Sequence, residues 1–409
     1  MFQSRRVATM GGDQFRDEKS LSFDGTDAFL RCAGGAIFND GVDGAEGNNS
    51  ITDAEWTISC WIKIRSLPGA RSPIVGWLSN THKNYGTGIM LESDGKIYAI
   101  NSSNSLDCYN ERVSITSGEW HHVVASCNGV GASKKVRLYI DGKLEQNTTT
   151  TTNPYSYLFC IGAGQQSAGT FNGYFNGWIS DVAIYSEWHH AHEVEQLYNE
   201  GQPFNHKEGP RRANLELWFR MGDGNYDSMG NFNGVIGDEV NGLALDIATG
   251  SDGNIVTNGT MEADSDWDDY SIGAGESQAR SDEQAHSGTY SRKVVATGSG
   301  AGITQTVTNA TYHVYEGNFY VYPNVTTITV QAADTLGAQP ITGLTANEWN
   351  HVRYFFNTSD GSSELARVRA SEEATYYVDD FSIKKLIGHA ATTKGMSIAD
   401  ITGDVPSVS

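Results

Sequence analysis

Apolar and polar positions alternate along short runs of this chain, and tight turns separate the runs. In residues 136–140, Val, Leu and Ile alternate with Arg and Tyr. This pattern predicts a strand with one buried face and one wet face. Asp141-Gly142 follows that run, and Asp94-Gly95 separates two further apolar runs. Both pairs supply the positive φ angles of a two-residue hairpin turn, so the pattern predicts antiparallel hairpins.

Strand-like runs of this kind fill two blocks of the chain. The first block has them at 56–64, 72–78, 88–91, 97–100, 121–127, 136–140, 159–163 and 177–185. The second block has them at 291–296, 303–308, 312–321, 327–333, 349–357 and 376–383. One short helix is predicted at 191–199, ended by Gly201. The fold class is therefore all-β: two antiparallel β-sandwich jelly rolls joined by a bridging segment, with polar N- and C-terminal arms.

Changes in composition divide the chain into five parts. They are an N-terminal arm (1–19), a first sandwich (20–206), a linker with a bridging strand segment (207–254), a second sandwich (255–387) and a C-terminal tail (388–409). The polar arm is expected to be either disordered or docked on a neighbouring molecule. The motif E-W-H-H-V at 119–123 returns loosely as E-W-N-H-V at 348–352. We interpret this echo as two sandwiches of related design.

Charge narrows the classes of partner. The 409 residues include 49 acidic and 28 basic side chains, and the net charge is −21. Such a field repels phosphates and anionic membranes, so neither nucleic acid nor membrane insertion is expected. No apolar run is long enough to span a membrane, and the first residues lack the apolar core of a signal peptide. The five cysteines match no zinc pattern and are predicted to be buried thiols, with a Cys108–Cys127 disulfide left open.

Residues 20–206 carry a family resemblance. The matching segments, in order, are L-S-F-D-G-T-D at 21–27, W-T-I-S-C-W-I-K at 56–63, G-E-W-H-H-V-V at 118–124, L-Y-I-D-G-K-L at 138–144 and F-N-G-W-I-S-D-V-A-I-Y at 175–185. This region resembles the laminin-G-like, concanavalin A-like lectin/glucanase superfamily, which implies a two-sheet antiparallel jelly roll. The segment at 217–234 looks like the strand that usually opens such a module, although here it follows it. Either the sandwich is permuted or the segment belongs to a partner.

Residues 255–386 carry a second resemblance. The segments are N-G-T-M-E at 258–262 with Trp267, H-S-G-T-Y-S at 286–291, I-T-Q-T-V at 303–307 and Y-Y-V-D-D-F-S-I at 376–383. This region resembles the jelly-roll carbohydrate-binding modules found beside xylanases and glucanases. The resemblance implies a structural calcium held by Glu262 together with Asp379 or Asp380, and no organic cofactor.

Sugar binding would use aromatic faces against pyranose rings. The candidate residues are Trp77, Tyr85, Tyr98 and Tyr109 in the first sandwich, and Trp267, Tyr270 and Tyr315 in the second. Five other tryptophans lie in strand motifs and are assigned to cores: Trp56, Trp61, Trp120, Trp178 and Trp349. No catalytic residue is nominated, because residues 262–266 lack the final Glu of the E-x-D-x-x-E pattern of glucanases.

Binding-type modules without an enzyme motif or export signal favour a non-catalytic structural and adhesion protein of a virion. A bacteriophage tail fibre or capsid decoration, made in the host cytoplasm and exposed on the virion surface, is the main hypothesis. Its expected partners are other virion proteins through the terminal arms, cell-surface glycans and further copies of the chain. The first alternative is an accessory carbohydrate-binding protein of a polysaccharide-degrading bacterium, located extracellularly or on the cell surface. The second is a divergent glycoside hydrolase.

Overall fold

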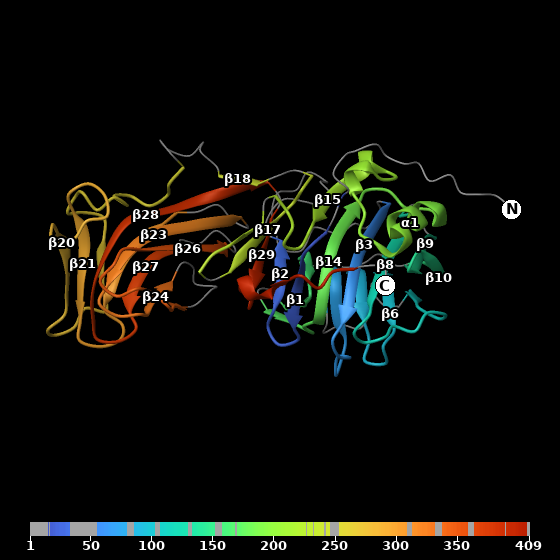
Figure 1. Cartoon of the computed structure of the whole chain (residues 1–409), viewed down its shortest axis with the longest axis horizontal. Coiled ribbons are helices and arrows are strands. Elements are labelled where there is room, and N and C mark those ends of the chain that lie inside the picture. Colours follow the sequence, from blue (N-terminus) through green and yellow to red (C-terminus); the bar gives the residue numbers. More distant parts are fainter. Residues whose placement is uncertain are drawn as a thin grey trace.

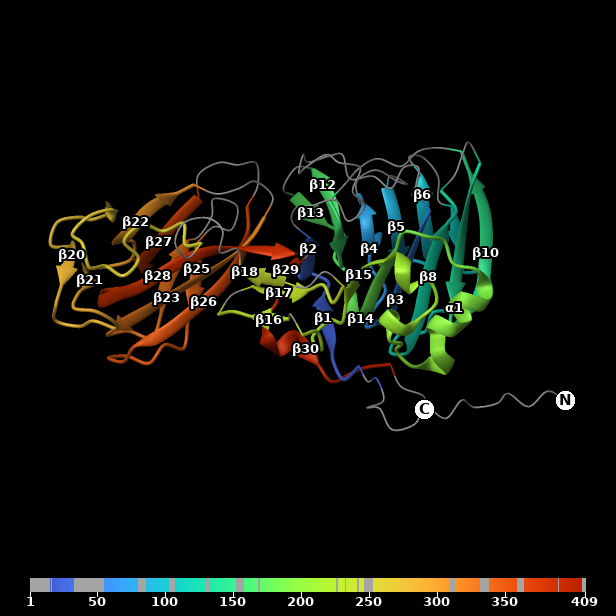
Figure 2. The ribbon, with the colours of Figure 1, turned by 90° about the horizontal axis from the view of Figure 1, so that it is seen from above.

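Two β-sandwiches lie side by side along the long axis of the molecule (Figures 1 and 2). The computed structural model describes residues 15, 17–32, 55–79, 86–102, 107–129, 133–151, 158–167, 170–225, 227–231, 233–240, 243–245, 253–308, 313–331, 338–358, 364–388 and 390–406. No helix in these ranges is long and apolar enough to cross a membrane.

The first sandwich consists of two antiparallel sheets. The eight-stranded sheet has the order β10 (Lys143–Thr150), β9 (Lys134–Ile140), β8 (Trp120–Cys127), β3 (Trp56–Ile64), β14 (Asn176–Tyr185), β1 (Ser20–Asp24) and β30 (Ile401–Thr402), and β15 (Leu215–Phe219) also pairs with β14. The nine-stranded sheet has the order β16 (Ser228–Met229), β17 (Gly234–Gly237), β29 (Ala390–Lys394), β2 (Phe29–Cys32), β11 (Cys160–Ile161), β4 (Ser72–Leu78), β5 (Gly86–Leu91), β6 (Ile97–Ser102) and β7 (Cys108–Tyr109). The inward residues of both sheets form one core.

Short elements complete this sandwich. Helix α1 (Ala191–Tyr198) places Val194 against Val124 and Tyr139 on the outer face of the eight-stranded sheet. Strands β12 (Gly164–Ser167) and β13 (Thr170–Asn172) form a hairpin. The 3₁₀ helices are η1 (Asn199–Gly201), η2 (His206–Glu208), η3 (Arg212–Asn214) and η4 (Ile398–Asp400).

The second sandwich has a six-stranded and a five-stranded sheet. The first has the order β20 (Ser277–Ser281), β21 (Ser291–Ala296), β28 (Ala374–Gly388), β23 (Val314–Pro323) and β26 (Asn350–Asn357), with β18 (Leu243–Leu245) beside β28. The second has the order β19 (Asp268–Tyr270), β22 (Gly302–Val307), β27 (Glu364–Ala370), β24 (Ile328–Gln331) and β25 (Gln339–Ile341). Alternate residues of these strands pack into a separate core.

The bridging segment and the C-terminal segment both belong to the first sandwich. Strand β14 has a bulge at Asp181, where φ is 52°. Before the bulge β14 pairs with β1, and after it β14 pairs with β15, so these two strands share one position in the sheet. Strands β15, β16 and β17 therefore complete this chain's own sandwich. Residues 390–402, expected to lie in a polar tail, form β29 between β17 and β2, and β30 beside β1.

The second sandwich is thus an insertion between β17 and β29. Strand β28 runs for 15 residues toward the first sandwich, where β29 begins (Figure 2). Val235, Val314, Phe355 and Leu386 form a buried cluster between the two sandwiches. Next to it, backbone N–H of Asn231 donates to the carbonyl oxygen of Arg353 at 2.6 Å. Polar and apolar contacts together hold the two sandwiches against each other.

All five cysteines are free thiols. The Cys108 thiol donates to the carbonyl oxygen of Val136 at 2.9 Å, and burial raises its pKa to about 12. The disulfide that the sequence left open between Cys108 and Cys127 is not formed. Cys127 instead accepts a hydrogen bond from the Asn101 amide at 3.2 Å.

Candidate functional site

The structure describes six of the seven aromatic residues that the sequence suggested for sugar binding, and it does not bring these six together. Trp77, Trp267 and Tyr315 are only 2%, 4% and 2% exposed and pack in the two cores. Their ring faces contact protein, so they offer no platform for a sugar. The Trp267 indole also donates to the carbonyl oxygen of Asn258 at 3.0 Å, which holds the opening segment of the second sandwich.

Two of the other candidates lie side by side in the first sandwich, and a third lies in the second. Tyr98 and Tyr109 are neighbours on β6 and β7, with ring centroids 5.5 Å apart and the Lys96 ammonium 4.8 Å from the Tyr109 ring. Tyr270 lies on β19 of the second sandwich, under the guanidinium of Arg367. Tyr85 lies outside the described residues.

A different set of aromatic rings lines the outer face of the six-stranded sheet. On β23, Phe319 and Val321 point into the core, so Tyr320 and Tyr322 between and after them point outward. In the sheet register Tyr322 is opposite Tyr377 of β28, and Tyr320 is opposite His351 of β26. Ring centroids are 6.0 Å apart in the first pair and 4.8 Å apart in the second.

Two further rings contact these two pairs. Trp349, just before β26, makes an edge contact with Tyr322 at 5.6 Å. His286, from the loop between β20 and β21, stacks on Tyr320 at 3.5 Å and contacts Trp349 at 5.5 Å. We call these six residues the aromatic strip: His286, Tyr320, Tyr322, Trp349, His351 and Tyr377. Trp349, which the sequence assigned to a core, is instead half-buried on this outer face.

Polar groups border the strip. The Tyr377 hydroxyl donates to Glu283 at 2.8 Å, and Lys293 donates to the same carboxylate at 2.6 Å. These hydrogen bonds hold the pKa of Glu283 below its usual range. The other end of the strip has the Asn318 amide oxygen 3.0 Å from Nε2 of His351. Aromatic faces with carboxylate and amide groups beside them are the usual composition of a sugar-binding surface.

The three carboxylates predicted to bind calcium do come together, around the turn at 286–290. Glu262 accepts backbone N–H of Thr289 at 2.8 Å and of Tyr290 at 3.0 Å. Asp379, fully buried, accepts backbone N–H of His286 at 2.8 Å. Asp380 lies 2.6 Å from Nδ1 of His286. The carboxylates thus anchor the loop that places His286 on the aromatic strip.

Hydrogen-bond donors, however, already surround these carboxylates. Asp379 also accepts backbone N–H of Ser287 and of Asp380. Burial raises the pKa of Asp379 to about 6, although these backbone donors oppose the rise. No three His, Cys, Asp or Glu side chains in the described ranges are arranged to hold a metal ion. The predicted structural calcium stays a prediction, and hydrogen bonds from these carboxylates help to join the opening segment, the turn and β28.

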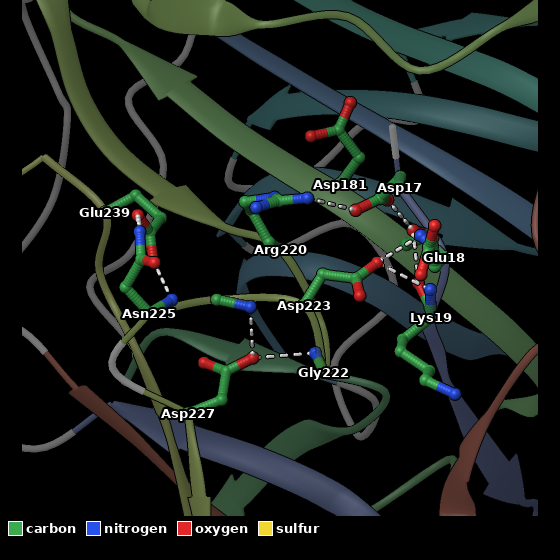
Figure 3. Close-up of polar contacts among 12 residues, drawn as sticks. Asp17, Glu18, Lys19, Asp181, Arg220, Gly222, Asp223, Asn225, Asp227 and Glu239 are labelled. Carbon is green, nitrogen blue, oxygen red and sulfur yellow. Dashed lines mark hydrogen bonds and ion pairs between the residues drawn. The ribbon is translucent and has the colours of Figure 1, made fainter. Parts of the chain in front are cut away.

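A second polar cluster anchors the N-terminal segment on its own sandwich (Figure 3). Asp223, in the turn after β15, accepts backbone N–H of Glu18 and Lys19. Asp17 is buried and accepts the Ser180 hydroxyl at 2.6 Å. The guanidinium of Arg220 lies 3.4 Å from Asp17. Burial raises the pKa of Asp17 to about 9, and the nearby charge of Asp181 adds to the rise.

The rest of this cluster shapes the turn after β15. Asp227 accepts backbone N–H of Gly222 at 2.7 Å and of Gly224 at 3.0 Å. Glu239 accepts from the backbone and side chain of Asn225 (Figure 3). Two carboxylates of the motif that the sequence singled out at 217–234 therefore hold the turn after β15 and the N-terminal segment in place. Sequence reasoning noticed the motif but gave no role to these carboxylates.

The first sandwich also contains a buried chain of polar groups. Nε2 of His206 is 3.1 Å from Asp181, and Nδ1 is 2.6 Å from the Tyr185 hydroxyl. The Trp218 indole also donates to Asp181. Burial opposes ionisation of Asp181, but His206 and Trp218 outweigh it and lower its pKa. All four side chains are at most 3% exposed, so this chain of hydrogen bonds stabilises the interior and does not face a substrate.

Comparison with known proteins agrees with the architecture. Residues 39–195 match the family model described as the concanavalin A-like lectin/glucanases superfamily. A search of the curated proteins returned no match.

Several solved structures are similar to parts of the chain. A family 16 carbohydrate-binding module is 20% identical, and the match covers 32% of this chain and 99% of that chain with a TM-score of 0.25. A second similar structure is that of a "putative carbohydrate binding protein" from Bacteroides ovatus ATCC 8483. It is 12% identical over 55% of this chain and 56% of that chain, with a TM-score of 0.38. A heptameric SAP-like pentraxin from Limulus polyphemus is 18% identical over 44% of this chain and 82% of that chain, with a TM-score of 0.32. At these values the structural matches carry no argument about function. The family match thus covers residues 39–195, and the described strands form antiparallel β-sandwiches of the kind that the sequence predicted.

Proposed function

We propose that this chain is a non-catalytic glycan-binding protein, and that the aromatic strip is its sugar-binding surface. The main support for this proposal is a set of six aromatic rings that contact one another on one outer sheet face. The C–H faces of pyranose rings pack on aromatic rings, and carboxylate and amide groups bind their hydroxyls. Trp349 has the largest ring of the strip, and this ring contacts both His286 and Tyr322.

The proposal extends to an adhesion role on a virion, as a tail fibre or capsid decoration. An adhesin must hold its binding surface at a fixed distance from its anchor. Strand β28 and the buried cluster around Phe355 support this, because they fix the second sandwich against the first. Contacts with other virion proteins, assembly with further copies and location on the virion surface are parts of this proposal.

An accessory carbohydrate-binding protein of a polysaccharide-degrading bacterium is the alternative. Such a protein would use the same aromatic strip, so the glycan itself separates the two functions. Binding to plant or algal polysaccharides favours the accessory protein, whereas binding to bacterial surface glycans favours the adhesin. Release of reducing sugar from a bound glucan would instead revive the glycoside hydrolase.

Glycan-array binding of purified wild type and Trp349→Ala tests the proposal. We expect the variant to lose at least about tenfold in affinity, the factor that corresponds to 1.4 kcal/mol. Trp188→Ala is the matched control, because Trp188 is another half-buried tryptophan but lies in the first sandwich. Equal binding by wild type and Trp349→Ala, with both folded, would contradict the assignment of the strip.

A further inference from the structure

The opposite sheet of the second sandwich carries a pair of half-buried arginines on its outer face. Arg367 and Arg369 alternate on β27 with Ala366 and Val368, which are buried in the core. Both arginines therefore point to the outer face of the five-stranded sheet. Residues two apart on a strand are separated by about 7 Å, so the two guanidinium groups start from neighbouring positions.

Arg367 is fixed by groups on three neighbouring strands. Its guanidinium carbon lies 3.7 Å from the centre of the Tyr270 ring on β19. It donates to the Gln331 amide oxygen on β24 at 2.9 Å and to the Thr304 hydroxyl on β22 at 3.3 Å. The ring and these two neutral acceptors hold the guanidinium in one orientation without neutralising its charge.

Arg369 differs in its surroundings. Its Nε is shielded from solvent and has no hydrogen-bond acceptor among the described residues. Its neighbours across the sheet are Gly302 on β22 and Thr329 on β24, which carry no charge. An orphaned donor of this kind calls for an acceptor that the described protein groups do not supply.

Neither arginine forms an ion pair within the described ranges. Other arginines of the molecule do pair with a carboxylate: Arg71 with Glu92, Arg211 with Glu193, Arg292 with Asp264 and Arg353 with Glu316. The chain has 49 acidic and only 28 basic residues, so intramolecular partners are plentiful. On this face the exposed Asp268 is opposite Thr304, two strands from Arg367 and about 10 Å away.

We infer that the outer face of the five-stranded sheet binds an acidic glycan through Arg367 and Arg369. A guanidinium matches the two oxygens of a carboxylate or sulfate, and a sugar acid offers such a group beside hydroxyls that Thr304 and Gln331 can bind. Nucleic acid is disfavoured because the net charge of −21 repels a phosphate chain, whereas single acidic groups are bound locally within the screening length of about 8 Å. This site goes beyond the proposed function, since it lies on the other sheet from the aromatic strip.

Titration of immobilised full-length protein with alginate oligomers, dextran sulfate and neutral dextran tests the inference. We expect alginate, dextran sulfate or both to bind, more weakly as sodium chloride is raised, and neutral dextran to be insensitive to these arginines. R367Q/R369Q should weaken acidic-glycan binding at least about tenfold. R367K/R369K, which keeps both charges but loses the planar fork, should lie between wild type and the glutamine variant.

Two controls separate this site from general charge and from the aromatic strip. R112Q/K135Q removes two exposed cations from the first sandwich and should leave acidic-glycan binding unchanged. Trp349→Ala should do the same, so failure of the aromatic strip would not be mistaken for failure of this face. Undiminished binding in both R367Q/R369Q and R367K/R369K, no binding by any acidic polymer, or tighter binding of single-stranded DNA than of alginate would each overturn the inference.

Discussion

Replacement of Asp17 by asparagine should stabilise the protein, and increasingly so as the pH rises. The Asp17 carboxyl is shielded from solvent, and burial raises its pKa to about 9 from an ordinary value of 3.8. Folding at neutral pH therefore requires this group to take up a proton. The asparagine amide would keep an acceptor for the Ser180 hydroxyl, which donates to Asp17 at 2.6 Å, but would need no proton.

The sign and size follow from linkage. The pKa of Asp17 is higher in the folded than in the unfolded protein. The contribution of the protonated Asp17 to the free energy of unfolding is therefore fully present below pH 3.8 and is lost as the pH rises toward about 9. One proton changes the free energy of unfolding by about 1.4 kcal/mol per pH unit. Between about pH 5 and about pH 7, the variant should gain up to about 3 kcal/mol relative to wild type. The Arg220 guanidinium, 3.4 Å away, favours the ionised carboxylate and makes this figure an upper limit.

Urea unfolding of wild type and Asp17→Asn at several pH values measures this difference directly. Asp94→Asn, which changes an exposed turn carboxylate, is the control for general effects of one lost charge. A stability difference that grows with pH only for Asp17→Asn supports the reasoning. Parallel pH profiles for wild type and Asp17→Asn would refute it, because they would mean that Asp17 is ionised in the folded protein.

Two further variants test the interface and the carboxylates around the 286–290 turn. Phe355→Ala removes a buried ring from the cluster between the sandwiches, so it should lower the free energy of unfolding by about 3–5 kcal/mol. In calorimetry it should split a single unfolding transition into two. One unshifted transition would contradict a coupled interface. Glu262→Ala should lower the melting temperature of the second sandwich in chelator as well as in calcium, because Thr289 and Tyr290 lose their backbone acceptor in both. An additional decrease found only in calcium would support the predicted ion.

The sequence predicted most strands of this fold because their faces differ in polarity. The 136–140 run became β9 and the 191–199 segment became α1, each within a few residues. Strand β29, A-A-T-T-K, was missed because it has no clear alternation. Its place is set by pairing with β2 and β17, which lie far away along the chain, and no local pattern records such pairing.

The aromatic strip was missed for a related reason. On β23 the inward Phe319 and Val321 alternate with the outward Tyr320 and Tyr322, so both faces are aromatic or apolar. A run of this kind does not reveal which side meets solvent. The family resemblance suggested the three carboxylates at 262, 379 and 380 as calcium ligands, and that role stays a prediction. Their hydrogen-bond partners depend on the turn geometry around Gly288, where φ is 61°, and no local pattern shows this geometry.

The nested topology has a consequence for synthesis on the ribosome. Strand β29 is an interior strand of the nine-stranded sheet, third from one edge, yet its residues are translated after the whole second sandwich. The second sandwich can therefore fold while the first sandwich still lacks an interior strand, although domains usually fold from the N-terminus onward. Until residues 390–394 leave the exit tunnel, β2 and β17 have unpaired edges, which are prone to aggregation. A stalled or truncated chain would thus present a finished second module on an open first one.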